Sequence, residues 1–130
     1  MRSAAFGAGS ILVLLALAGA PAAVAAPAGS SSCFFPSQWQ GWKAPDAHTI
    51  YLHVGLHDIY RLRTKGACPA LLSADAHLVN RIRGASTICS PLDFDLDVAD
   101  SNGFRSACII DSMTRLSPAE AAAIPPKLRP

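Results

Sequence analysis

Four cysteines constrain this chain more than any other feature of its sequence. Cys33, Cys68, Cys89 and Cys108 are the full set, their number is even, and no two form a Cys-x-x-Cys pair. In a small domain outside the cytoplasm, such a set predicts two structural disulfides. A zinc site is the competing interpretation, and it is disfavoured because metal-binding cysteines usually occur in close pairs.

The chain opens with the pattern of a secretory signal peptide, which we expect to span residues 1–25. Arg2 supplies the basic start, an apolar run follows at 11–18, and Ala23-Val24-Ala25 forms a small-x-small cleavage site. An uncleaved membrane anchor is the alternative, but the apolar run is shorter than the roughly 20 residues that cross a bilayer. Ala20 stands where a lipoprotein would carry its acylated cysteine.

The residues after the leader divide into a flexible lead-in at 26–32, which is small and polar, and a single disulfide-linked domain at 33–130. This part keeps all but one of the 11 basic residues and all nine acidic residues, so it is almost neutral. A nucleic-acid partner is not expected, because it calls for a basic surface. We also expect no stable membrane insertion once the leader is removed.

Alternating apolar and polar residues predict short antiparallel strands. Residues 49–54 and 59–63 form one expected hairpin around a turn at Gly55–Asp58, with Tyr60 and Leu62 facing inward. A further short strand is expected at 77–82.

A second hairpin is expected near the acidic strand at 93–98, whose apolar residues face inward and whose aspartates face outward. Asn102-Gly103 is the strongest short signal for a two-residue turn. The return strand would run from Phe104 to Ile110 and carry Cys108.

The segment at 33–42 is rich in aromatic residues, and Pro36 and Gly41 argue against a long regular element there. Its rings are expected mainly in the core, and an exposed aromatic platform is the alternative. These aromatic residues are Phe34, Phe35, Trp39 and Trp42.

One short C-terminal helix is expected to start at Ser117-Pro118-Ala119-Glu120, where Ser117 and Glu120 form a capping box, and to end at Pro125-Pro126. The expected fold is therefore mainly β: a small antiparallel barrel or sandwich of five or six short strands with this helix, cross-linked by disulfides.

Two patterns raise the question of a metal site. Asp93, Asp95 and Asp97 have the spacing of the first ligands of an EF-hand loop, but Val98 occupies the position that needs glycine. A strand with one wet face produces the same spacing. Four histidines are also present, and their two closest members straddle an expected turn; they are His48, His53, His57 and His77. No metal, cofactor or catalytic residue is predicted from these patterns, since no known catalytic motif accompanies them.

The cysteine frame, the Cys68-Pro69-Ala70-Leu71 segment and Leu116-Ser117-Pro118-Ala119-Glu120 resemble a family of small exported proteobacterial proteins catalogued as a domain of unknown function. The resemblance covers roughly residues 33–123 and implies a periplasmic or secreted protein, without implying an activity.

For the disulfides we predict Cys33–Cys108, which would join the first and last β segments, and Cys68–Cys89. For the function we expect a non-catalytic binding or structural domain with an envelope or extracellular protein partner. The first alternative is a secreted inhibitor of an envelope-attacking hydrolase, which needs a rigid exposed loop such as Gly55–Asp58 or Asp100–Gly103. The second alternative is a weak metal-binding protein or an enzyme.

Cleavage of the leader is directly testable. We expect the mature protein to begin at or near Ala26, because cleavage after Ala25 follows the small-x-small site. N-terminal sequencing of the exported protein measures this, and membrane-bound material that retains Met1 would contradict it.

Overall fold

The computed structural model describes residues 33–84 and 86–130, and all elements below lie within these ranges. The signal peptide expected at 1–25 and the lead-in expected at 26–32 lie outside the described residues.

One sheet has four antiparallel strands in the order β1-β2-β3-β7. Its strands are β1 (Trp39–Asp46), β2 (Thr49–Val54), β3 (Asp58–Thr64) and β7 (Ile110–Arg115). The expected hairpin is confirmed: Val54 pairs with Asp58, and Tyr51 pairs with Arg61. The inward positions of Tyr60 and Leu62 are confirmed as well, since both side chains are buried.

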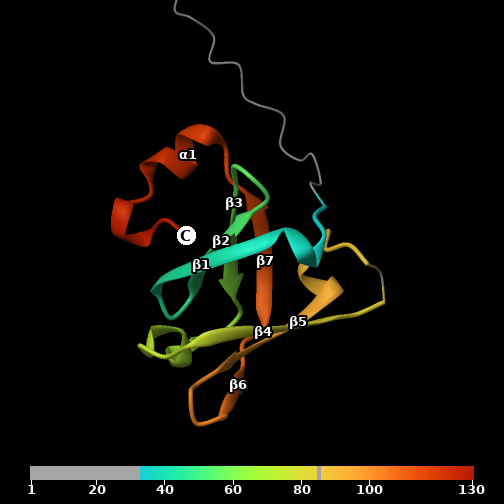
Figure 1. The fold of residues 1–130 in the computed structure, drawn as a ribbon, viewed down its shortest axis with the longest axis vertical. Helices are drawn as coiled ribbons and strands as arrows, with labels where there is room; N and C mark the ends of the chain where they lie inside the picture. Colours follow the sequence, from blue (N-terminus) through green and yellow to red (C-terminus); the bar gives the residue numbers. More distant parts are fainter. Residues whose placement is uncertain (1–32, 85) are drawn as a thin grey trace, which may run out of the picture.

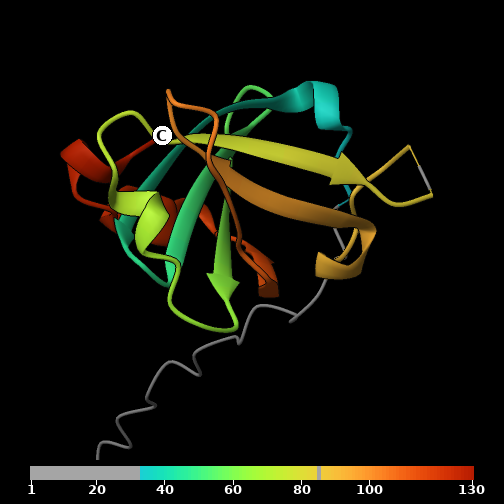
Figure 2. The same ribbon diagram turned by 90° about the horizontal axis from the view of Figure 1, so that it is seen from below.

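The second sheet has three antiparallel strands in the order β4-β5-β6. Its strands are β4 (His77–Ile82), β5 (Phe94–Ala99) and β6 (Arg105–Ala107). β4 and β5 cross over the strands of the larger sheet, so that the fold is sandwich-like and not a closed barrel (Figure 2). The mainly β fold class expected from the sequence is confirmed.

The core lies between the two sheets. Its members come from the inward faces of β2, β3 and β5 and from residues near the cysteines; they include Phe34, Ile50, Leu52, Val54, Tyr60, Leu62, Leu71, Ile88, Phe94, Leu96 and Val98. The rings of Phe34 and Tyr60 approach within 4.8 Å. Burial of such side chains is the main force that holds a small sandwich together, at about 1.5–3 kcal/mol for each large apolar residue.

The segment at 33–42 differs from the expectation, because β1 starts at Trp39 and includes Gly41. β1 is an edge strand whose pairing with β2 is interrupted twice, between Trp39 and Gly41 and between Lys43 and Asp46. Pro36 precedes the strand, in the 3-10 helix η1 (Pro36–Gln38). Glycine is tolerated at such irregular edge positions, which explains why Gly41 does not end β1. The four aromatic residues divide between the two interpretations: Phe34 is buried, both tryptophans are partly buried, and Phe35 is exposed.

The predicted return strand at 104–110 is also wrong as a single element. β6 pairs with β5, the chain then passes through Cys108 and Ile109, and β7 joins the other sheet beside β3. Periodicity cannot reveal this change of sheet, since both pieces are extended.

The disulfides are Cys33–Cys89 and Cys68–Cys108, so the predicted pairs Cys33–Cys108 and Cys68–Cys89 are wrong. Cys33 reaches Cys89 because Phe34 and Ile88 form a two-way backbone bridge, with N···O distances of 3.0 and 2.8 Å.

Cys68 reaches Cys108 because β3 and β7 are neighbouring strands. Thr64, shortly before Cys68, pairs with Ile110, shortly after Cys108. In both cases, strand pairing decided the partner.

The predicted C-terminal helix is confirmed as α1 (Pro118–Ala123), with the Ser117–Glu120 capping box in place. The Glu120 carboxylate accepts hydrogen bonds from the backbone N–H and the hydroxyl of Ser117, which lower the pKa of this carboxyl. Ile124, directly after the helix, is buried, so this short helix is anchored to the sandwich rather than left to fray. None of the helices in the described residues is long and apolar enough to cross a membrane.

The two disulfides differ in exposure, and we expect them to be reduced in order. Cys33 and Cys89 are exposed, whereas Cys68 and Cys108 are 4% and 3% exposed. A mild reductant in native buffer, followed by alkylation and mass spectrometry, should label the Cys33–Cys89 pair first. Loss of the second bond should then unfold the domain, because each cross-link, spanning 56 and 40 residues, contributes about 4 kcal/mol in the chain-entropy model. Simultaneous labelling of all four cysteines would contradict this order.

Candidate functional site

The turn between β5 and β6 together with the strand residue on each side of it, residues 99–105, is the strongest candidate for a functional surface, and we call it the tip hairpin. It extends from the sandwich at the end opposite α1 (Figure 1). Every residue from Ser101 to Ala107 is exposed.

The turn of the tip hairpin is closed by its own backbone. Gly103 N–H donates to the Asp100 carbonyl over 3.1 Å, and Asp100 N–H donates to the Phe104 carbonyl over 3.1 Å. The loop between the paired residues therefore has three members, Ser101 to Gly103, and Gly103 has a φ of +86°. This differs from the expected two-residue Asn-Gly turn, and it is the three-residue arrangement in which a final glycine takes a left-handed conformation.

The Asp100 side chain stabilises the same turn from within. Its Oδ1 accepts from the backbone N–H of Asn102 at 2.9 Å and of Phe104 at 3.0 Å. An aspartate that bonds backbone groups two and four residues ahead holds a turn in one conformation. The Asp100 carboxylate thus holds the backbone of the tip hairpin in one conformation.

A second aspartate ties the hairpin to the rest of the fold. Asp75 Oδ2 accepts from the hydroxyl of Ser101 at 2.5 Å and from its backbone N–H at 3.0 Å. Both bonds lower the pKa of the Asp75 carboxyl, and the bond from the Ser101 hydroxyl has the larger effect. This carboxyl therefore stays ionised at neutral pH. Asp75 and Ser101 are 26 residues apart in the sequence, so these bonds hold the hairpin in place relative to a distant segment of the fold.

Phe104 is the chemically distinctive residue of the tip hairpin. Its side chain is 77% exposed although it is large and apolar. Arg105 follows it and is also exposed. Exposed aromatic and arginine side chains on an ordered scaffold are the residues that most often dominate protein–protein binding.

A groove lies next to the anchor of the hairpin. Its volume is about 380 Å³, and its walls include Trp42 and Lys43 of β1 and Leu72 of the 3-10 helix η2 (Pro69–Leu72). Ala74 and Ala76, the neighbours of Asp75, also line it. The groove thus lies between β1 and the segment that carries Asp75, and none of its lining residues belongs to the tip hairpin.

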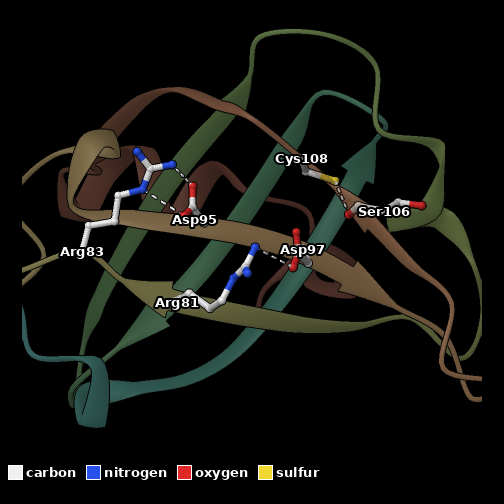
Figure 3. A network of polar contacts seen from close by, with 6 residues as sticks. All are labelled: Arg81, Arg83, Asp95, Asp97, Ser106 and Cys108. Carbon is white, nitrogen blue, oxygen red and sulfur yellow. Dashed lines mark hydrogen bonds and ion pairs between the residues drawn. The ribbon is translucent and has the colours of Figure 1, made fainter.

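The acidic residues considered as calcium ligands have other partners. Asp93 Oδ2 accepts from the backbone N–H of Cys89 and Ser90, which lower the pKa of its carboxyl. Arg83 bonds Asp95 and lowers the pKa of that carboxyl, and Arg81 lies 3.3 Å from Asp97 (Figure 3).

Asp97 also departs from the expected solvated face, because it is only 8% exposed in the centre strand of its sheet. Its apolar neighbours Leu96 and Val98 face the core as expected.

The histidines are not gathered into a ligand set. His53 Nε2 lies 3.4 Å from the carbonyl of Leu56, so its ring turns toward its own hairpin. Among the described residues, no three or more His, Cys, Asp or Glu side chains are placed to hold a metal ion.

The other loop considered for an inhibitor, around Gly55–Asp58, is held mainly at its ends. Gly55 N–H donates to the Gln38 carbonyl, and Asp58 begins β3 and pairs with Arg115 at 2.6 Å. Leu56 is exposed at its tip. Sequence reasoning identified both loops, but it missed the exposure of Phe104 and the role of Asp75, which depends on a contact between distant segments.

Comparisons of this chain with models of known protein families, with curated proteins and with solved structures found no significant match.

The order of the tip hairpin is testable through Gly103. Gly103→Val should lower the free energy of unfolding by about 1–2 kcal/mol, because a β-branched residue is strained at a φ of +86° although no atom lies within 4 Å of the added Cβ. Gly66→Val is the matched control, since Gly66 also faces open space but lacks a positive φ. Denaturant unfolding measures both, and equal effects of the two substitutions would contradict the assigned turn.

Proposed function

We propose that this chain is an exported, non-catalytic domain that binds a protein partner through the tip hairpin. The observation that carries the proposal is the position of Phe104, which is 77% exposed on a turn held by Asp100 and Asp75. Leaving a large apolar ring in water is unfavourable for the free protein, and a partner that buries it recovers about 1.5–3 kcal/mol.

The order of the hairpin adds to this argument. A loop that is already fixed loses little conformational entropy on binding, so more of the contact energy appears as affinity. The hydrogen bonds from Asp100 and Asp75 restrain the backbone on both sides of the turn without burying Phe104.

The exported location is part of the same proposal. Its support is the leader-like sequence at 1–25, the resemblance to an exported proteobacterial family, and two disulfides, which form and persist in oxidising compartments. A periplasmic or secreted partner follows from this location.

A secreted inhibitor of a hydrolase is the second candidate function. The observation that favours it is the combination of an ordered, protruding loop with an extended, exposed segment after it at 104–107. A hydrolase inhibitor must place such a segment in the active-site cleft of the enzyme and dissociate from that cleft slowly.

The binding proposal is tested by placing a photo-crosslinking amino acid, benzoylphenylalanine, at position 104 in the organism that produces the protein. We expect one defined protein adduct at this position. The matched control is the same amino acid at Leu92, which is 80% exposed but lies in the 3-10 helix η3 (Pro91–Asp93), outside the tip hairpin. The proposal is wrong if neither position gives an adduct or if both give the same one.

A further inference from the structure

The outer edge of β6 offers backbone groups to a partner. Phe104 and Cys108 use their backbone groups toward β5, through the bonds Asp100 N–H to Phe104 O at 3.1 Å and Cys108 N–H to Leu96 O at 2.8 Å. Because alternate residues of an antiparallel strand bond to opposite sides, the N–H and C=O groups of Arg105 and Ala107 point away from β5. No other strand of the described chain lies on that side of β6.

The side chain of Arg105 differs from those of the other arginines around β5 in its partners. The nearby Arg81 and Arg83 bind Asp97 and Asp95, whereas Arg105 forms no ion pair with any residue of the described chain. An exposed guanidinium on a short, fixed strand suits a partner with a carboxylate.

These two features coincide at one residue, and together they describe what a serine endopeptidase with trypsin-like specificity recognises. Such an enzyme pairs its backbone with an extended segment, holds the attacked carbonyl in its oxyanion hole, and binds an arginine side chain at a buried carboxylate. Arg105 supplies both the outward carbonyl and the guanidinium. Phe104 does not qualify, because its carbonyl accepts the hydrogen bond from Asp100.

We propose that Arg105 is the specificity residue through which this domain inhibits trypsin-like serine endopeptidases. The proposal deepens the proposed function, since it rests on the tip hairpin being a binding surface and names the class of partner. The Arg105–Ser106 bond occupies the active site, and Ala107 pairs with the enzyme two residues further along.

Both sides of this bond are restrained, which favours inhibition over digestion. On one side the turn is held by Asp100, and on the other Cys108 is fixed by its disulfide to Cys68. Hydrolysis would add one water across the Arg105–Ser106 amide, giving a carboxylate and an amine. Both new ends would stay attached to the fold, so the cleaved segment would leave the active site slowly.

Inhibition of trypsin by the full oxidised protein is the test, measured with a small chromogenic substrate. We expect inhibition at a defined stoichiometry, and a loss of about 30-fold or more in affinity for Arg105→Ala, as expected when a buried charge pair loses one member. Arg105→Phe should transfer inhibition from trypsin to chymotrypsin. Because Arg105 is exposed, these variants should keep the thermal unfolding midpoint of the parent.

Arg63→Ala is the matched control and should inhibit trypsin like the parent. Arg63 is exposed as well, but it lies in β3, a strand that is paired with β2 on one edge and with β7 on the other. β3 therefore has no free edge for an enzyme to pair with. The proposal is overturned if the parent fails to inhibit trypsin, if trypsin turns it over rapidly at Arg105, or if both arginine variants behave alike. A position-104 crosslink to a partner that is not a peptidase would leave the binding function standing and remove this inference.

Discussion

The buried disulfide between Cys68 and Cys108 is the constraint on which the arrangement of the two sheets depends. Cys68 follows the last residues of β3, and Cys108 lies in the short passage where the chain leaves β6 for β7. Both cysteines belong to the core cluster, so the bond fixes the sheets to each other where one chain segment crosses between them. The tip hairpin is therefore held at its base by a covalent bond and at its turn by Asp100.

This double restraint explains how a small domain can present an ordered surface outside its core. Domains of about 100 residues bury a smaller fraction of their surface than larger domains do, and exposed loops are usually their least ordered parts. Here aspartates provide the order: Asp100 bonds within the turn, Asp75 joins it to a distant loop, and Asp93 caps the 3-10 helix before β5. Most carboxylates near β5 thus have a structural use, whereas the exposed side chains of Phe104 and Arg105 have no hydrogen-bond or ion-pair partner within the described residues.

The elements that sequence patterns predicted well are those with short-range causes. Alternation of apolar and polar residues at 49–54 and 59–63 predicted the first hairpin, because each strand of this antiparallel pair turns one face to the core and the other to solvent. The Ser117–Glu120 capping box predicted α1 in the same way, since the partners lie three residues apart. β1 was missed because its pairing with β2 is irregular, and the passage from β6 to β7 was missed because both segments are extended.

Local sequence patterns were enough to predict two cross-links, the positions of most strands, the helix cap and a turn near Gly103. Each of these follows from residues close together in the chain, where side-chain spacing and backbone preference act directly. Tertiary packing establishes which cysteines meet, which sheet each strand joins, and that Phe104 and Arg105 stay exposed while Asp97 is covered. These outcomes depend on strand neighbours far apart in sequence, because the energy of pairing and burial is gained only when distant segments pack together.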